Sequence, residues 1–245
     1  MTTNYNRITH EYQRSKQQPW RQFIECFTLF ELIGDLAGQD VLDLACGEGY
    51  YTRQLKQHGA ARAVGVDIST GMIDLARRQE ANEPLGVEYL VGDAKQIRLG
   101  ERFDLAVAGY LLNYAATRED LLAMCRTIAD SLKPGCRFVS VNNNPAQPRS
   151  QFPLGRKYGF VKSAPEEPQD GTPITWTFFL DEGPFSITNY QLSVALHEKL
   201  FHEAGFRELH WHQPRLMPEG AAAYEPGFWT DFLEHPPIIF LECVR

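Results

Sequence analysis

The chain has 245 residues, 43% of them hydrophobic, and carries a formal net charge of −7 at pH 7. That size and composition allow one large core, so we expect a single α/β domain with an insertion rather than two domains. The acidic balance argues against a nucleic-acid partner, since such proteins usually present a basic stripe, and favours a small-molecule substrate.

The first 37 residues carry two helical patterns ahead of the first predicted strand. The earlier pattern precedes Pro19 and has no continuous apolar stripe, so we interpret it as a lid over a ligand. The later pattern, from about Trp20 to Leu36, has an apolar face that predicts contact with the core. That face consists of Phe23, Phe27, Phe30 and Ile33. We therefore assign residues 1–37 to an N-terminal helical lid.

From residue 38 onward, strand patterns alternate with helical patterns, which is typical of a mostly parallel sheet with helices on both faces. The predicted strands lie near residues 40–45, 62–67, 86–91, 103–108 and 136–142, and the predicted helices near 49–58, 69–80 and 118–131. Ser69 and Thr117 are suitable N-caps for the last two helices.

The pattern changes after residue 142. Residues 145–173 contain six prolines, a density that excludes regular helix and predicts a loop excursion. Two alternating segments follow, 174–180 and 185–190, and together they predict an antiparallel hairpin. A helix over 192–204 that ends at Gly205, and strands at 209–211 and 238–243, complete the chain. The domain of residues 38–245 thus contains an insertion at about 142–190.

A glycine loop follows the first predicted strand, where Val41–Ala45 runs into Cys46-Gly47-Glu48-Gly49 and then into a helical pattern. Gly47 and Gly49 permit a positive φ and a close approach of the backbone to a ligand. The amide groups at the start of the next helix point to the same place. Thr52 replaces the third glycine of a dinucleotide-binding loop, and Asp43 adds negative charge, so both disfavour a pyrophosphate.

The second predicted strand ends in Asp67, twenty residues after Gly47. In a parallel sheet this carboxylate lies beside the glycine loop, where it suits the two hydroxyls of a ribose. Two glycines after a strand form a plain turn more often than a ligand site. Asp67, and Asp93 after the third strand, favour the ligand site, because two carboxylates at one sheet edge repel each other unless they have a function.

The segment Asp43-Leu44-Ala45-Cys46-Gly47-Glu48-Gly49 resembles the first motif of class I S-adenosylmethionine-dependent methyltransferases. Later landmarks over residues 38–141 resemble the same family, including Gly92-Asp93-Ala94, Phe103–Ala108 and Leu132–Val139. The resemblance implies a doubly wound, Rossmann-like sheet of seven strands, mostly parallel, with an antiparallel last strand and an inserted loop or hairpin that covers the substrate. It also implies an enzyme that uses S-adenosyl-L-methionine and releases S-adenosyl-L-homocysteine.

The resemblance also implies a set of cofactor-binding residues. Asp67 would hold the ribose, Ile68 and Met72 would flank the adenine, and Asp93 would contact the adenine amine. The whole set is Tyr12, Asp43, Ala45, Gly47, Glu48, Gly49, Asp67, Ile68, Met72, Gly92, Asp93, Ala94, Gly109 and Tyr110.

The aromatic residues of the insertion predict a surface for a flat heterocycle or a cation. We expect the substrate to contact Trp20, Tyr158, Trp176, Phe178 and Phe179. Because strand side chains alternate, about half of the aromatic residues in the insertion belong to the core, and the sequence does not choose between Trp176 with Phe178 and the off-phase Phe179. Tyr110 and Asn113, after the fourth strand, and Tyr12 in the lid are the candidate residues that position the reacting groups.

Methyl transfer to a neutral nitrogen depends mainly on positioning, which can lower a barrier by roughly 7–11 kcal/mol, whereas a hydroxyl needs a base. The chain lacks an Asp/Asn-Pro-Pro-Tyr segment after the fourth strand, which argues against DNA bases or protein glutamine as acceptors. Within the family, Tyr12, the Phe-rich second helix, Phe185–Tyr190 and Pro226–Trp229 resemble the small-molecule N-methyltransferases of toxoflavin biosynthesis, which suggests an azapteridine-like acceptor. Methylation of oxygen or carbon in another natural product, and a non-catalytic protein that binds S-adenosylmethionine, are the alternatives.

The cell compartment is predicted from the cysteines and from the hydropathy of the chain. The five cysteines show no metal-binding spacing, which indicates reduced thiols and no metal. No apolar run is long enough to cross a bilayer, and the polar N-terminus does not resemble a secretion signal. We therefore expect a cytoplasmic protein without a membrane partner, either a monomer or a homodimer.

Overall fold

The computed structural model describes residues 13–165 and 168–245. Its main sheet has seven strands in the order β3-β2-β1-β4-β5-β10-β9. The strands span Asp40–Leu44 (β1), Arg62–Asp67 (β2), Glu88–Val91 (β3), Phe103–Gly109 (β4), Leu132–Asn143 (β5), Glu208–His212 (β9) and Ile238–Val244 (β10). Strands β1 to β5 are parallel to one another, and β10 is antiparallel to both β5 and β9. The predicted Rossmann-like sheet with an antiparallel last strand is confirmed.

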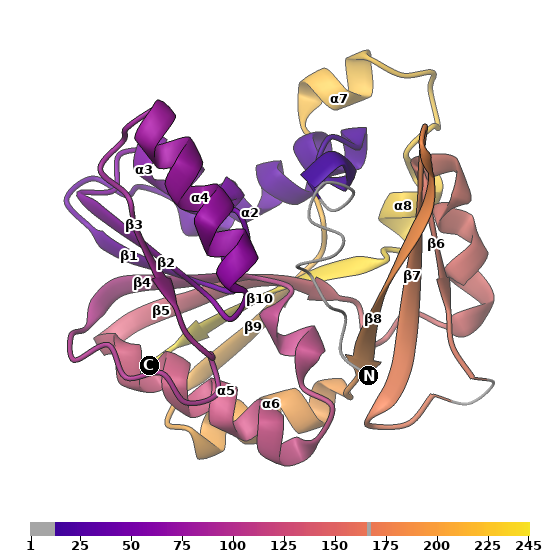
Figure 1. The fold of residues 1–245 in the computed structure, drawn as a ribbon. Helices are drawn as coiled ribbons and strands as arrows, with labels where there is room; N and C mark the ends of the chain where they lie inside the picture. Colours follow the sequence, from indigo (N-terminus) through magenta and orange to yellow (C-terminus); the bar gives the residue numbers. More distant parts are fainter. Residues whose placement is uncertain (1–12, 166–167) are drawn as a thin grey trace.

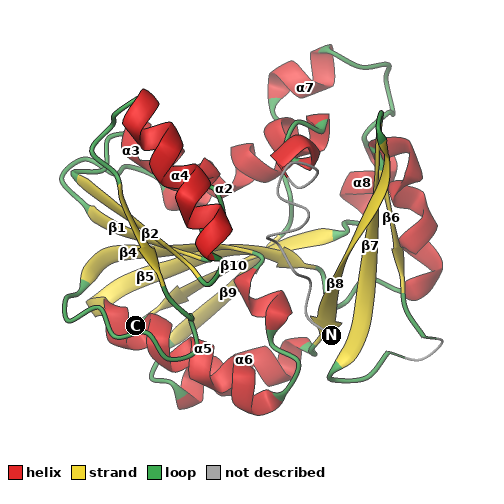
Figure 2. Ribbon diagram, in the orientation of Figure 1, coloured by secondary structure: helices red, strands yellow, loops and turns green. Residues whose placement is uncertain are grey.

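Helices cover both faces of the main sheet, as Figure 1 and Figure 2 show. One face carries α2 (Phe27–Ile33), α3 (Tyr50–Gln57) and α4 (Thr70–Asn82), and the other carries α5 (Arg118–Ser131) and α6 (Val194–Glu203). Ser69 and Thr117 accept hydrogen bonds from the backbone amides of Met72 and Asp120, so both predicted N-caps are confirmed.

The insertion forms a second sheet that stands beside the main one (Figure 1). Its order is β6-β7-β8, with β6 at Phe160–Ser163, β7 at Thr172–Leu180 and β8 at Gly183–Gln191, all antiparallel. The predicted hairpin is therefore confirmed, and its two strands are two and three residues longer than predicted. Trp176 and Phe178 lie on the buried face of β7, and they stack at a centroid distance of 5.8 Å.

The proline-rich segment differs from the predicted loop. Residues Arg149–Tyr158 form the 3₁₀-helix η4, which accommodates Pro153, and β6 follows it. The prolines exclude an α-helix but not this tighter turn, and none of them lies within β6, whose backbone is free to pair with β7. The apolar side chains of Phe152, Tyr158 and Phe160 are buried and fix the segment to the core.

The N-terminal helical pattern also differs in detail. Instead of one helix from Trp20 to Leu36, the chain forms the π-helix η2 (Arg21–Cys26) and then α2. Arg21 and Glu25, both in η2, are buried as an ion pair. A π-helical turn inside a longer helix is often found at a functional site.

Three short helices complete the fold: η3 (Leu111–Tyr114), α7 (Pro218–Ala222) and α8 (Thr230–Glu234). The aromatic core beside the second sheet joins Trp20, Tyr158, Phe160, Trp229 and Phe232. It fixes the second sheet to η2 and α8. Within the described residues, no helix is both long enough and apolar enough to span a bilayer.

Candidate functional site

The loop between β1 and α3 lies at the carboxyl edge of the main sheet and has the left-handed backbone predicted from its glycines. The φ values are 61° at Ala45, 57° at Gly47 and 86° at Gly49. A Cβ on Gly49 would lie 2.3 Å from the hydroxyl of Tyr89, whereas a Cβ on Gly47 would face open space. Gly49 thus serves the packing of the loop, and Gly47 leaves a side open to a ligand.

Asp67 at the end of β2 holds this loop. Its Oδ2 accepts a hydrogen bond from the Gly47 amide at 2.9 Å, and its Oδ1 accepts one from the Ser69 amide at 2.8 Å. Burial raises the pKa of the carboxyl group, and the two amide hydrogen bonds oppose that rise. Each oxygen of a carboxylate accepts a further hydrogen bond, so Asp67 can still bind the hydroxyls of a ribose.

Two more carboxylates lie at the same edge. Asp43 is 1% exposed; its Oδ2 accepts a hydrogen bond from the Thr52 hydroxyl at 2.7 Å. The Oδ1 of Asp43 and the Oε2 of Glu48 are buried, and neither has a hydrogen-bond partner within residues 13–165 and 168–245. Burial, above all, raises the pKa of Asp43 to about 7, and the charges of Asp67 and Glu48 add to the rise. Such a cluster attracts a cation and repels a pyrophosphate.

A cationic ligand beside Asp43 should bind more weakly as the pH falls. Because a cation binds the ionised carboxylate, a group with a pKa of about 7 must lose its proton first. Ionisation falls from about one half at pH 7 to about one tenth at pH 6, so we expect a roughly fivefold weaker affinity for S-adenosylmethionine at pH 6. Calorimetric titration at both pH values measures this ratio. The Asp43→Asn variant should bind more weakly and show no such ratio; an equal ratio in both proteins would contradict the role of Asp43.

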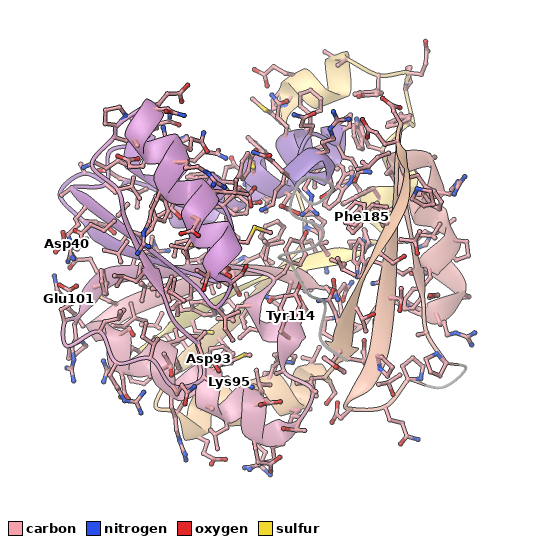
Figure 3. The ribbon with its side chains drawn as sticks, viewed as in Figure 1. Asp40, Asp93, Lys95, Glu101, Tyr114 and Phe185 are labelled. Carbon is pink, nitrogen blue, oxygen red and sulfur yellow. The ribbon has the colours of Figure 1, made fainter. Side chains whose placement is uncertain are left out.

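The far end of the edge has the features expected around an adenine. Ile68 is 67% exposed, whereas Met72, in α4, is buried. Asp93 follows β3, where its Oδ1 accepts a hydrogen bond from the Lys95 amide at 2.9 Å (Figure 3). Gly92 precedes Asp93, and a Cβ on it would lie 2.3 Å from Ile97, while the neighbouring Ala94 is buried. An exposed isoleucine beside two acidic strand ends suits a flat base linked to a ribose.

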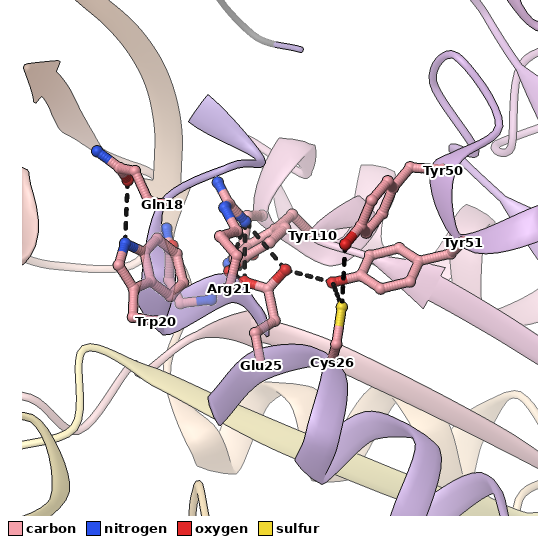
Figure 4. Close-up of polar contacts among 10 residues, drawn as sticks. Gln18, Trp20, Arg21, Glu25, Cys26, Tyr50, Tyr51 and Tyr110 are labelled. Atoms are coloured by element: carbon pink, nitrogen blue, oxygen red, sulfur yellow. Dashed lines mark hydrogen bonds and ion pairs between the residues drawn. The ribbon is translucent and has the colours of Figure 1, made fainter. Parts of the chain in front are cut away.

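A buried ion pair contacts Tyr110, the residue that follows β4 (Figure 4). Nη1 of Arg21 lies 2.8 Å from Oε2 of Glu25, and both side chains are at most 2% exposed. The hydroxyls of Tyr51 and Tyr110 both donate hydrogen bonds to Glu25. Tyr110 has a φ of 64°, which places its ring on this pair immediately after β4. The arrangement fixes the orientation of Arg21 and Tyr110.

The other candidate residues after β4 have different neighbours. Gly109 ends β4, and a Cβ on it would approach the Tyr51 ring to 3.2 Å. Asn113 is buried, and its Oδ1 accepts a hydrogen bond from the Asn143 amide at 3.1 Å. Asn113 thus ties η3 to the end of β5.

A pocket opens between η3, the end of β5 and the second sheet. Its walls are Arg21, Tyr110, Tyr114, Asn143, Trp176, Phe178, Ile187 and Asn189. Tyr114 lies in the middle of the molecule in Figure 3, between Asp93 and the hairpin that carries Phe185. Because Tyr110 belongs both to this pocket and to the strand edge beside the glycine loop, we call the space the acceptor pocket.

The remaining candidate residues are spread over three places. Trp176 and Phe178 line the acceptor pocket, whereas Phe179 faces the other way, with the Arg156 guanidinium 3.5 Å from its ring centre. Trp20 and Tyr158 pack in the aromatic core, where Tyr158 donates a hydrogen bond to the Phe228 carbonyl. Tyr12 lies outside the described residues.

The sequence interpretation omitted Arg21, Glu25, Asn143 and Asn189. Arg21 and Glu25 stand four residues apart in the same helical pattern, and opposite charges at that spacing are a signal for an ion pair. The run Asn142-Asn143-Asn144 at the end of a strand is another polar signal in an apolar setting. Asn189 carried no such signal, since its burial depends on how the second sheet docks.

Known proteins resemble this chain in sequence and in fold. Residues 41–135 match the family described as a methyltransferase domain. Over 171 residues, or 69% of this chain and 70% of the relative, the chain is 29% identical to N-demethylindolmycin N-methyltransferase of Streptomyces griseus. Ubiquinone biosynthesis O-methyltransferase of Coxiella burnetii is 30% identical over 112 residues, which is 44% of this chain and less than half of the relative, at 46%. A crystal structure of an S-adenosylmethionine-dependent methyltransferase from Mesorhizobium loti has the same fold, with a TM-score of 0.65, 22% identity and coverage of 90% and 97% of the two chains.

The matched residues 41–135 contain the part of the sheet edge that runs from the glycine loop to Asp93, which we call the cofactor edge. That edge fits S-adenosylmethionine: Gly47 is open, Asp43 has a buried oxygen to offer a cation, Asp67 suits the ribose and Ile68 is exposed for the adenine. The chain therefore has the fold of the class I S-adenosylmethionine-dependent methyltransferases, and its residues 41–135 match a methyltransferase domain.

Proposed function

We propose that the enzyme methylates a nitrogen atom of a small metabolite, a flat heterocycle of the azapteridine type. The observation that carries this proposal is the acceptor pocket. Its aromatic walls, Tyr110, Tyr114, Trp176 and Phe178, suit a planar ring. The similarity to N-demethylindolmycin N-methyltransferase, over more than two thirds of each chain, supports nitrogen as the acceptor atom.

When bound, S-adenosylmethionine supplies a methyl group on a positively charged sulfur. We propose that Asp67 orients the ribose and that Asp43, with Glu48, holds the cationic end of the cofactor. Tyr110, fixed by Glu25, separates the cofactor edge from the acceptor pocket and keeps water away from the reacting atoms. These roles are ones of binding, orientation and exclusion of water.

The transfer balances without a further reactant. The lone pair of the acceptor nitrogen forms the new N–C bond, the S–C bond breaks with its electron pair left on sulfur, and S-adenosylhomocysteine results. A proton then leaves the methylated nitrogen for water. None of the eight residues given above as walls of the pocket is a histidine or a carboxylate. This lining favours a neutral nitrogen over a hydroxyl, which needs a base within reach.

The N-terminal 37 residues belong to the same proposal. We infer that they cover the site, since η2 supplies Arg21 to the acceptor pocket and Glu25 to the hydrogen bonds beneath it. The domain of residues 38–245 supplies the cofactor edge and, through its insertion, the second sheet. We further propose that the enzyme works in the cytoplasm, as a monomer or homodimer, without a nucleic-acid partner.

Methylation of oxygen is the second candidate, because of the similarity to ubiquinone biosynthesis O-methyltransferase over 44% of the chain. A screen decides between the two: the enzyme is incubated with methyl-labelled S-adenosylmethionine and a library of nitrogen heterocycles, amines and phenols. We expect label in nitrogen heterocycles and none in phenols. Labelled phenols without labelled heterocycles would refute the nitrogen assignment.

A further inference from the structure

The acceptor pocket has a polar edge that the proposed function does not use. Three of its wall residues carry a buried side-chain atom without a hydrogen-bond partner among the residues that the structure describes: Nε1 of Trp176, Oδ1 of Asn143 and Nδ2 of Asn189. The three side chains are 2%, 6% and 1% exposed, respectively. Buried polar atoms in proteins are almost always hydrogen-bonded, so each such atom requires an explanation.

The two asparagines are held in place by their other atoms. Nδ2 of Asn143 donates a hydrogen bond to Oδ1 of Asn189 at 3.4 Å. This bond leaves Oδ1 of Asn143 as an acceptor and Nδ2 of Asn189 as a donor. The Tyr114 hydroxyl interacts with Asn189, so a ligand carbonyl at Nδ2 takes the place of that hydroxyl. The backbone amide of Asn143 is fixed by Asn113, and Asn189 lies in β8 opposite Ile174 of β7.

Trp176 is also held in place, by contacts with three neighbouring side chains. Its ring lies 4.8 Å from Phe160 and 5.8 Å from Phe178, and Lys162 Nζ lies 5.1 Å from its centre. The indole N–H can only donate a hydrogen bond. The polar edge therefore presents two donors and one acceptor.

The pocket is close to electroneutral. Arg21 is the charged residue among its walls, and both oxygens of Glu25 accept hydrogen bonds from the same Nη1, at 3.1 Å and 2.8 Å. The ring of Trp20 lies 4.3 Å and that of Tyr110 lies 5.3 Å from the Arg21 guanidinium carbon. A charged ligand would enter this apolar space without a counterion, which carries a large cost.

The pocket is also narrow. Its cavity volume is about 10 Å³. An acceptor must therefore displace part of the wall, and a flat ring needs the smallest displacement.

We propose that the acceptor is a neutral planar ring with an amide edge, in which a ring carbonyl and a ring N–H lie side by side. The carbonyl accepts hydrogen bonds from Trp176 and Asn189, and the N–H donates one to Asn143. The nitrogen that receives the methyl group is a different ring atom, turned toward Tyr110. This assignment rests on the proposed function, since it takes the pocket as the acceptor site.

Three bicyclic probes of nearly equal shape test the proposal by calorimetry, with the protein saturated with S-adenosylhomocysteine. Quinazolin-4(3H)-one has the amide edge, quinazoline lacks it, and quinoline-4-carboxylate carries a negative charge. We expect quinazolin-4(3H)-one to bind at least tenfold more tightly than either of the other two. Equal binding of the first two, tighter binding of the carboxylate, or no binding of quinazolin-4(3H)-one would each overturn the proposal.

Two variants test whether Trp176 and Asn189 bind the amide edge of quinazolin-4(3H)-one. Trp176→Phe keeps the aromatic wall but removes the donor, and Asn189→Ala removes the other donor. Each should weaken quinazolin-4(3H)-one about 5- to 10-fold and leave quinazoline unchanged. Trp211→Phe is the matched control, because its indole N–H donates to Glu198 far from the pocket, at 3.2 Å; it should change neither affinity. A parallel loss for both probes in both variants would assign these residues a purely structural role.

Binding of S-adenosylhomocysteine distinguishes a failure of the amide-edge proposal from a failure of the proposed function. Binding of S-adenosylhomocysteine to each variant shows that it is folded and that the cofactor edge is intact. If this ligand binds but the probes do not discriminate, the amide edge is wrong and the methyltransferase assignment stands. If S-adenosylhomocysteine does not bind to the unmodified protein, the proposed function itself fails.

Discussion

Replacement of Glu25 by alanine is expected to destabilise the protein by about 3–5 kcal/mol, because it removes the carboxylate that neutralises the buried Arg21 charge. The hydroxyls of Tyr51 and Tyr110 lose their acceptor at the same time. Chemical denaturation, monitored by fluorescence, measures the free energy of unfolding. Since native proteins are stable by only about 5–15 kcal/mol, this loss is a large part of the total free energy of unfolding.

A double variant distinguishes charge burial from simple loss of contacts. The change of Arg21→Met together with Glu25→Leu removes both charges and fills similar volume, so it should cost less than Glu25→Ala alone. Glu88→Ala is the matched control, since Glu88 pairs with Arg62 at 2.6 Å on the surface, where the expected loss is within about 1 kcal/mol. A double variant as unstable as the sum of the single variants would contradict this reading of the ion pair.

Replacement of Asp67 by alanine is expected to weaken S-adenosylmethionine binding about 10- to 100-fold, since a charge-assisted hydrogen bond contributes about 1.5–3 kcal/mol. The structure adds a second reason for the loss. Asp67 also holds the Gly47 and Ser69 amides, so the variant loosens the loop that the cofactor contacts. Calorimetric titration with S-adenosylmethionine measures the affinity.

Asp74→Ala serves as the control for that experiment. Asp74 is an exposed acid on α4, one helix turn beyond Thr70, and its removal changes the net charge by the same amount. Its affinity should equal that of the unmodified protein. Equal affinities for the Asp67 and Asp74 variants would remove Asp67 from the cofactor site.

The sequence predicted the main sheet well because its signals are local. Apolar strands such as Val41–Leu44 are bounded by glycines and acids, and the helices after them carry their own caps at Ser69 and Thr117. The antiparallel hairpin of β7 and β8 likewise shows an alternating pattern around a short turn. The π-helix η2 could not be predicted in this way, since its Arg21 contacts Tyr110, just after β4, and its Glu25 contacts Tyr51 of α3, and both partners are distant in the sequence.

One part of the candidate site could be predicted from the sequence, and the other part could not. Gly47, Asp67 and Asp93 stand at strand ends, and parallel pairing brings strand ends to one edge, so the cofactor edge could be predicted. The acceptor pocket joins η2, β5 and β8, which are far apart in the sequence. The residues that line it are brought together when the second sheet docks on the first. The periodicity of a single helix or strand does not predict that contact. The choice of Trp176 over Phe179 as a pocket wall therefore required the structure.

The most direct test of the account is a calorimetric titration of the unmodified protein with S-adenosylhomocysteine, followed by the same titration with NAD. Three carboxylates at the cofactor edge, Asp43, Glu48 and Asp67, should admit the sulfur nucleoside and repel the pyrophosphate. We predict saturable binding of S-adenosylhomocysteine at one site per chain and no measurable heat with NAD. Binding of NAD, or the absence of binding by S-adenosylhomocysteine, would contradict the account.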